Sequence, residues 1–198
     1  MKKIILASSS PRRKELLEKI GLKFVVEPGD CEEIFDTYLA PHEMVRKLSR
    51  EKAESVARKH RNAVIIAADT VVLIGDKILG KPHNQVEAKK MLQLLSGKSH
   101  FVITGFTIID TSLRRILSKA VETKVYIREL SPAEIDAYVK SGEPLDKAGG
   151  YGIQGLGSVL VEKIEGDYFN VVGLPLSALS ESLKEFGIDV WENWLREC

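Results

Sequence analysis

The sequence predicts an α/β fold whose sheet is mixed and partly antiparallel. The run from Ala63 to Ile74 is almost continuously apolar, which is typical of a central strand buried on both faces. Two long alternating runs, 100–109 and 115–128, are separated by only a short turn, and this spacing predicts an antiparallel hairpin. Helical patterns stand between the strands without strict alternation, so a doubly wound parallel sheet is not expected.

Local signals set the elements of the first part of the chain. Pro11 suits a first helical turn because its missing N–H would be unpaired there, with Ser10 as the N-cap and Gly21 ending the helix. Pro41 opens a longer helix with apolar residues at helical spacing. The expected elements are a strand at 2–8, a helix at 11–20, a strand at 23–26, an acidic loop at 27–37, a helix at 41–60 and a strand at 63–74.

The second part begins with a helix at 86–95 that Gly97 closes, followed by the hairpin. Ser131 then stands three residues before Glu134, which is the pattern of a helix N-cap with a capping box. The remaining expected elements are a helix to about 140, a glycine-rich segment, a strand at 158–164 and a helix at 175–186.

Length and charge limit the classes of protein to which the chain can belong. It has 198 residues, enough for a sizeable core, and we expect residues 1–198 to form a single domain. Its 29 Lys and Arg against 28 Asp and Glu give a net charge of +1, which argues against a nucleic acid or membrane partner held by bulk charge. A local anion site is compatible with this balance.

Cysteines and apolar runs indicate a cytoplasmic protein. Cys31 and Cys198 are the only two cysteines, and they form neither a disulfide framework nor a metal-like cluster. The apolar run from Ile4 to Ala7 is shorter than the roughly 7–15 residues of a signal-peptide core. No run approaches the roughly 18 apolar residues of a membrane span, so we expect no membrane partner.

Two glycine-rich segments match nucleotide-binding motifs in spacing but not in context. Gly75 to Lys81 is followed by Pro82, where a P-loop needs Ser or Thr and the start of a helix. The segment from Gly150 to Gly155 neither follows a predicted strand nor opens a helix, as a dinucleotide fingerprint must. We therefore expect Lys81 to be a lone cation near a strand end, and these glycines to permit close approach of the backbone to a ligand or another segment.

The segment from Ser8 to Arg13, Ser-Ser-Ser-Pro-Arg-Arg, gathers hydroxyls, helix N–H groups and two guanidinium groups at one strand-to-helix junction. Helix N-termini and arginine favour phosphate, so one interpretation is an anion site. The other is an N-cap followed by solvated surface arginines. The local sequence leaves both open.

Asp69 is a carboxylate inside the apolar run 64–74. A lone buried carboxylate costs several kcal/mol unless it has a partner, so it is either ion-paired in the core or faces a cleft as metal ligand or general base. We favour the second interpretation because no basic residue lies within the strand. The acidic loop with Asp30, Glu32 and Glu33, and Lys52 on the predicted helix, are by themselves typical of solvated surface.

Taken together, these segments resemble the Maf family of nucleoside triphosphate pyrophosphatases, which is named for inhibition of septum formation. They occur in one consistent order from residue 7 to residue 175. The matching segments are Ala7-Ser-Ser-Ser-Pro-Arg-Arg13, Arg50-Glu-Lys52, Ala67-Ala-Asp-Thr-Val-Val72, Gly80-Lys-Pro82, Leu95-Ser-Gly97, Gly142-Glu-Pro-Leu-Asp-Lys-Ala-Gly149, Tyr151-Gly-Ile-Gln-Gly155 and Val171-Val-Gly-Leu-Pro175.

The resemblance implies hydrolysis of a nucleoside triphosphate to the monophosphate and pyrophosphate, with water attacking the α-phosphorus. A divalent cation, Mg²⁺ or Mn²⁺, is implied as cofactor because the nucleophile approaches a polyanion. Asp69 and Glu33 are implied as general base or metal ligands, and Lys81 as the group that neutralises charge developing on the phosphates. The residues implied to cradle the triphosphate are Ser8, Arg12, Arg13 and Lys52.

The resemblance also implies a substrate and a shape. Arg12, Thr70 and Gln154 resemble the family branch that acts on dTTP and UTP, and modified pyrimidine nucleotides stay open as the biological target. The Gln154 amide offers both a donor and an acceptor to the O4/N3 edge of a pyrimidine. The family fold is an α/β structure of two lobes around a cleft, similar to inosine triphosphate pyrophosphatases. Its members are implied to act in nucleotide house-cleaning and cell division.

A different class of function is a non-catalytic regulator that binds nucleotide, or a protein partner, to arrest septation. The enzyme is favoured because a regulator would not need Asp69, Glu33 and Lys81 together. Nucleic acid binding is disfavoured because aromatic residues are only 7% and no basic stripe interleaves with them. A homodimer that pairs through the long hairpin is left open. We expect the near-zero net charge to conceal a cationic cleft around Asp69 and Glu33, formed by Arg12, Arg13, Lys52, Lys81 and Lys147.

Overall fold

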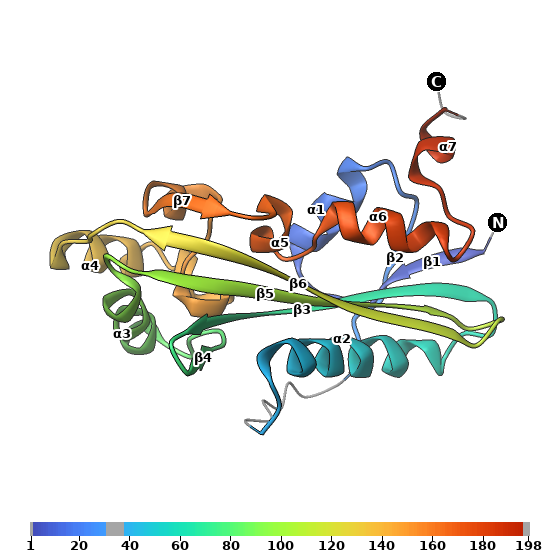
Figure 1. The fold of residues 1–198 in the computed structure, drawn as a ribbon, viewed down its shortest axis with the longest axis horizontal. Helices are drawn as coiled ribbons and strands as arrows, with labels where there is room; N and C mark the ends of the chain where they lie inside the picture. Colours follow the sequence, from blue (N-terminus) through green and yellow to red (C-terminus); the bar gives the residue numbers. More distant parts are fainter. Residues whose placement is uncertain (1, 31–37, 196–198) are drawn as a thin grey trace. The chain divides into compact units, whose positions relative to one another are not determined.

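The computed structural model describes residues 2–30 and 38–195, which form a mixed α/β structure as predicted (Figure 1). The elements are β1 (Lys3–Leu6), α1 (Pro11–Lys19), β2 (Val25–Val26), α2 (Pro41–Ala57), β3 (Ala63–Ile74), β4 (Lys77–Leu79), α3 (Gln85–Leu95), β5 (Ser99–Asp110), β6 (Arg115–Ile127), α4 (Pro132–Lys140), the 3₁₀ turns η1 (Glu143–Asp146), η2 (Ala148–Gly150) and η3 (Gly155–Val159), β7 (Val161–Glu165), α5 (Tyr168–Val172), α6 (Leu176–Lys184) and α7 (Val190–Leu195).

The described strands make one seven-stranded sheet in the order β2-β1-β3-β5-β6-β7, with β4 paired to β3. β1 runs parallel to both β2 and β3, so that Leu6 stands opposite Val26 and Ile66. β4 and β7 pair in the antiparallel sense with β3 and β6. β5 and β6 are neighbours joined by residues 111–114, and a connection this short joins antiparallel strands. The predicted mixed sheet and its hairpin are therefore confirmed.

The chain divides into two compact units. Unit 1 contains Met1–Asp69, Thr104–Val121 and Gly173–Cys198, and unit 2 contains Thr70–Ile103 and Glu122–Val172. Each of the three long strands β3, β5 and β6 contributes residues to both units. Within the described residues, no helix combines the length and the apolar character that crossing a membrane requires.

In unit 1, α2 lies against one face of the sheet, and α1 and α6 lie against the other (Figure 1). Odd-numbered residues of β3 pack with Ala53 and Val56 of α2 in one buried cluster. Gly105 of β5 permits close contact, because a Cβ there would lie 2.3 Å from the carbonyl oxygen of Val45. Buried hydroxyls join α2 to the hairpin, with Ser49 Oγ 2.8 Å from Thr107 Oγ1. These contacts fix the position of α2 along the sheet.

In unit 2, α3 and α4 pack over a second apolar cluster that includes Val72, Leu92 and Val125. α4 begins as predicted, with a capping box between Ser131 and Glu134. Within this core His100 is buried, and its Nε2 lies 2.6 Å from the hydroxyl of Tyr151. Among the described residues, His100 Nδ1 has no hydrogen-bond partner.

His100 makes the stability of the protein depend on pH. Burial lowers the pKa of His100 from 6.5 to about 4. Because the pKa of His100 is lower in the folded than in the unfolded chain, the unfolded chain binds the proton first as the pH falls. The full free energy of unfolding is therefore present above about pH 6.5, and part of it is lost as the pH falls toward about 4. We expect the free energy of unfolding to fall by about 2–3 kcal/mol across this window. Urea titrations of His100→Gln should show a flatter pH profile, while the exposed control His83→Gln should keep the wild-type slope. An unchanged slope in His100→Gln would contradict the assignment.

The largest departures from the predicted elements are short. β4 was not predicted, and it forms because Gly75, with φ of 55°, closes a two-residue turn after Ile74. The strand expected at 158–164 starts later, since residues 155–159 form a 3₁₀ turn and β7 covers Val161–Glu165. The helices α5 and α7 were also not predicted. The remaining elements agree within a few residues, although β1 ends at Leu6 and α2 at Ala57.

Candidate functional site

One group of predicted site residues lies in unit 1, where β1 ends beside the middle of β3. Ala7 donates its N–H to the carbonyl of Ile66 at 2.7 Å, which extends the parallel pairing beyond β1. In this register Ser8 stands beside Ala68, one residue before Asp69. The carboxyl ends of parallel strands are a common place for ligand binding in α/β sheets. Ser8 and Asp69 were both predicted site residues, and the strand pairing brings them together where β1 ends.

Asp69 and Lys52 form a buried ion pair between β3 and α2. Asp69 continues the odd-numbered face of β3 that packs on α2, and Lys52 precedes the packed residue Ala53. The Lys52 ammonium donates to Asp69 Oδ2, and the side chains are only 12% and 6% exposed. The ammonium therefore orients the carboxylate within the fold.

This pair corrects two expectations. We argued against an ion pair because β3 itself offers no basic residue, but the partner comes from α2, 17 residues earlier in the chain. Lys52, which by itself had the pattern of a solvated helix face, is largely buried by this contact. Asp69 is therefore ion-paired in the structure. Its catalytic role stays a prediction.

The acidic loop approaches the same pair. Gly29 lies against α2, where a Cβ would stand 2.9 Å from the carbonyl oxygen of Lys52 and 2.4 Å from Ser55 Oγ. Lys59 of the turn that follows α2 donates to Asp30 Oδ2 at 3.1 Å. The described part of the loop thus ends beside α2. Glu33, for which the resemblance implies a base or metal role, and Glu32 of the same acidic loop lie outside the described residues.

The arginines after β1 occupy different surroundings. Arg13 is held by the protein, because its Nε donates to the carbonyl of Gly173 at 2.9 Å and its Nη1 to Ser8 Oγ at 3.3 Å. Ser8 Oγ also accepts the N–H of Ser10 at 3.2 Å. Ser10 occupies the predicted N-cap position of α1, but its side chain makes no capping hydrogen bond. Arg12 is half-buried on the first turn of α1.

A second group of predicted site residues lies in unit 2, where Lys81 adjoins the glycine-rich segment. Gly149 donates its N–H to the carbonyl of Gly80 at 2.9 Å. Gly149 has φ of 73°, and a Cβ there would lie 2.9 Å from a methyl of Val72. Lys81 follows Gly80 directly and is exposed. This hydrogen bond holds Lys81 next to the segment that leads to Gln154. The close approach of Gly149 to Val72 agrees with the expectation that glycines in this region allow close approach of the backbone.

Thr70 and Gln154 are the two predicted specificity residues of unit 2. Successive side chains of a strand point to opposite faces, so Thr70 points away from the face that carries Asp69 and Lys52. Gln154 is half-buried at the start of η3, in an extended conformation. Lys147, which we expected among the cleft cations, donates to the carbonyl of Glu143 and to Asp146, each at 2.7 Å. The predicted convergence of Lys81 and Lys147 with the other basic residues on Asp69 and Glu33 stays a prediction.

The carboxylates of the site can be tested for their fit to a divalent cation. Within 2–30 and 38–195, no group of three or more His, Cys, Asp or Glu side chains is placed to hold a metal ion. Enzymes that bind Mg²⁺ with nucleotides commonly use one or two carboxylates together with the phosphates of the substrate. Asp69, a carboxylate within β3 beside the end of β1, fits that donor set.

Two structural roles near the site were missed from the sequence. The carbonyl of Gly173 orients Arg13, and Glu143 binds the backbone of the glycine-rich segment. Neither has a local signal, because both contacts involve backbone atoms far along the chain. A weak signal for Glu143 was available, since an acidic residue follows Gly142 in one of the matching family segments.

Comparison with known proteins places this chain in a family. The model of the family described as Maf-like protein matches residues 3–186. A dTTP/UTP pyrophosphatase of Bacillus cereus is 52% identical over 190 residues, covering 96% of this chain and 93% of the relative. One from Caldicellulosiruptor saccharolyticus is 49% identical, covering 98% of this chain and all of the relative. Among solved structures, the Ham1 protein of Staphylococcus aureus matches with a TM-score of 0.46 at 14% identity, covering 81% of this chain and 80% of that protein.

Proposed function

The chain belongs to the Maf family, and we propose that it hydrolyses dTTP and UTP to the monophosphate and pyrophosphate. The observation that carries this proposal is the identity of about half of all residues with dTTP/UTP pyrophosphatases, over nearly the full length of both proteins. In this proposal residues 1–198 act as one catalytic domain in the cytoplasm, where the nucleotide pool is found. A homodimer through the hairpin stays a prediction.

In the proposed reaction, water attacks the α-phosphorus and Asp69 accepts a proton from it. A general base must be held within hydrogen-bond reach of the proton that it takes. The Lys52 ammonium supports this role because it holds one oxygen of Asp69, and β3 holds the backbone. The oriented carboxylate then needs little rearrangement when the substrate binds.

The predicted basic residues and hydroxyls are proposed to bind the triphosphate. Arg13 is oriented in advance by Gly173 and Ser8, which reduces the side-chain entropy lost on binding. A guanidinium binds phosphate oxygens through paired N–H donors, which suits Arg13 to contact the triphosphate. Lys81 neutralises charge that develops on the leaving pyrophosphate. Arg12 and Lys52 also contribute positive charge.

The base and the metal involve the remaining predicted residues. Gln154, with Thr70 and Arg12, is proposed to recognise the pyrimidine through its amide donor and acceptor. In the alternative assignment that the resemblance leaves open, Asp69 and Glu33 hold the divalent cation against the phosphates of the substrate. When bound, Mg²⁺ or Mn²⁺ neutralises the triphosphate and lowers the pKa of water.

A substrate panel tests the proposal. The protein is incubated with Mg²⁺ and each of dTTP, UTP, CTP, dATP and GTP, and pyrophosphate and orthophosphate are measured separately. We expect pyrophosphate from dTTP and UTP in preference to the others, with one pyrophosphate for each monophosphate. Tight binding of these nucleotides with no pyrophosphate would contradict the proposal and favour a nucleotide-binding regulator. A faster reaction with purine or modified nucleotides would overturn the substrate assignment.

A further inference from the structure

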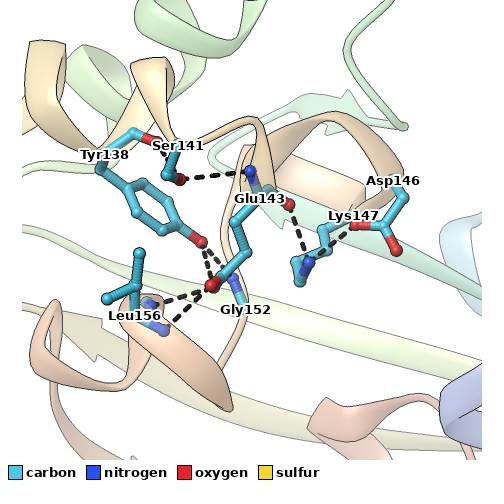
Figure 2. A network of polar contacts seen from close by, with 8 residues as sticks. Tyr138, Ser141, Glu143, Asp146, Lys147, Gly152 and Leu156 are labelled. Atoms are coloured by element: carbon cyan, nitrogen blue, oxygen red, sulfur yellow. Dashed lines mark hydrogen bonds and ion pairs between the residues drawn. The ribbon is translucent and has the colours of Figure 1, made fainter.

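We propose that Glu143 is a positioning residue that holds the backbone of residues 152–157 and thereby fixes Gln154 for discrimination between uracil and cytosine. This inference rests on the proposed function, because it concerns how the same enzyme recognises its base. It assigns to Glu143 no contact with the nucleotide. Its basis is a network of hydrogen bonds within unit 2 (Figure 2).

The Glu143 carboxylate binds the end of the segment directly. Oε2 accepts the N–H of Leu156 at 2.9 Å, and Oε1 accepts the N–H of Gly157 at 3.0 Å. The Tyr138 hydroxyl donates to Oε1 at 3.0 Å. Figure 2 shows these donors converging on one carboxylate. Hydrogen bonds to a charged acceptor are stronger than those between neutral groups, so this contact is a firm attachment.

Tyr138 extends the attachment to the start of the segment. Its hydroxyl oxygen accepts the N–H of Gly152 at 3.1 Å while its proton is donated to Glu143. Gly152 and Gly157 are therefore held by the same pair of side chains. Gln154 lies between these two fixed points, so the path of its backbone depends on the network.

Glycines let the segment fit closely around the network. Gly155 has φ of 67°, and a Cβ there would lie 2.7 Å from Oε2 of Glu143. A Cβ on Gly157 would lie 2.2 Å from the carbonyl oxygen of Gly152 and 2.6 Å from the Tyr138 hydroxyl. Of the glycines whose spacing resembles a dinucleotide motif, Gly152 and Gly155 are explained by this packing, whereas Gly150 lies against Ala88 and Met91 of α3.

The backbone of Glu143 is itself held by hydrogen bonds. Its N–H donates to Ser141 Oγ at 3.2 Å, and its carbonyl accepts the Lys147 ammonium at 2.7 Å. Gly142, with φ of 76°, turns the chain from α4 into η1. The carboxylate thus links the rigid end of α4 to the glycine-rich segment.

The carboxylate form suits the three donors. Burial alone would raise the pKa of Glu143, but hydrogen bonds from Gly157, Leu156 and Tyr138 together outweigh it, so that the net pKa lies below its ordinary value. A depressed pKa means that the network is complete above the ordinary range of a glutamate and weakens as the pH falls through the lowered value. Glutamine at position 143 would place an NH₂ group against one of the backbone N–H donors, so that hydrogen bond would be lost.

Fixing Gln154 matters because an amide is nearly symmetric in shape but not in hydrogen bonding. Uracil and thymine present an acceptor at O4 and a donor at N3, whereas cytosine presents a donor at N4 and an acceptor at N3. An amide that can turn over would serve either base equally well. Discrimination against cytosine therefore requires Gln154 to be held in one orientation, which a fixed backbone supports.

The test compares UTP with CTP in matched variants. In Glu143→Gln we expect the ratio of kcat/KM for UTP to kcat/KM for CTP to fall about 10- to 100-fold, because a displacement of about 1 Å can cost this much. The exposed glutamate control Glu162→Gln should keep the wild-type ratio. In a Gln154→Ala background, Glu143→Gln should change the ratio no further. Tyr138→Phe should shift the ratio in the same direction by less, and it serves where Glu143→Gln does not fold.

An equal fall in kcat for both nucleotides, with an unchanged ratio, would overturn the positioning role and indicate a structural one. So would a ratio that falls further in the double variant than in Gln154→Ala. Equilibrium binding of the α,β-imido analogues of UTP and CTP separates this inference from the proposed function. If the wild type binds the UTP analogue preferentially but hydrolyses neither substrate, the proposed function fails and the loss of preference in Glu143→Gln still decides the role of Glu143. Equal binding of both analogues by the wild type would overturn the inference.

Discussion

Replacement of Asp69 by asparagine is expected to lower the rate of pyrophosphate release from dTTP and UTP by about 10²–10⁴-fold, which is the usual contribution of a general base. The substitution keeps the size of the side chain and one carbonyl oxygen that can accept the Lys52 ammonium, but removes the basic carboxylate. The loss should therefore appear mainly in kcat. Initial rates with saturating dTTP and Mg²⁺ measure it.

Asp110 offers a matched control. It is also a buried carboxylate paired with a lysine, Lys2. Its Oδ1 accepts the backbone N–H groups of Ser112 and Leu113 in the hairpin turn. Asp110 lies next to the start of β3, because the N–H of the following residue, Thr111, donates to the carbonyl of Ala63. Ala63 is six residues before Asp69, so the two carboxylates are about 20 Å apart along the strand. Asp110→Asn should lower stability and leave kcat unchanged. Equal activity in Asp69→Asn and the wild type would remove Asp69 from the proposed mechanism.

Replacement of Lys52 by methionine is expected to lower the free energy of unfolding by about 3–5 kcal/mol. Removing one member of a buried ion pair leaves the other charge without compensation, which is among the most destabilising single changes. Methionine keeps most of the apolar stem of lysine, so the loss reports the charge rather than a cavity. Urea unfolding at neutral pH measures the change, which is a large fraction of the stability of a typical domain.

A second substitution isolates the ion pair from other effects. In Lys52→Met combined with Asp69→Asn, the uncompensated carboxylate is gone, and we expect most of the lost stability to return. The double variant should remain inactive because the base is absent. A loss below about 1 kcal/mol in Lys52→Met would show that the pair behaves as a solvated surface contact. Additive losses in the double variant would show that the two residues do not interact.

The sequence predicted the elements whose signals are local. The capping box of Ser131 and Glu134 and the apolar run of β3 depend on neighbouring residues, and both are found where they were expected. β4 and α5 span only a few residues and have no periodic pattern to reveal them. Short elements form because their neighbours pack against them, and that packing is not visible in the segment itself.

The candidate site was predicted in its residue types but not in their pairing. Asp69 was identified because a carboxylate in an apolar strand is costly to bury unless it has a partner or a function. Its partner Lys52 could not be identified, since the contact depends on how α2 packs across β3. Glu143 was missed for a different reason: its partners include the backbone N–H groups of Leu156 and Gly157, which leave no pattern in the side chains.

Hydrolysis of dTTP in water enriched in ¹⁸O tests the central proposal most directly. If water attacks the α-phosphorus, one ¹⁸O enters dTMP and none enters pyrophosphate, and mass spectrometry of both products measures this for each turnover. We expect the label in dTMP for dTTP and in UMP for UTP, with its rate of appearance reduced in Asp69→Asn. Label in pyrophosphate would show attack at the β-phosphorus, and orthophosphate as the first product would show attack at the γ-phosphorus. Either result would contradict the proposed pyrophosphatase.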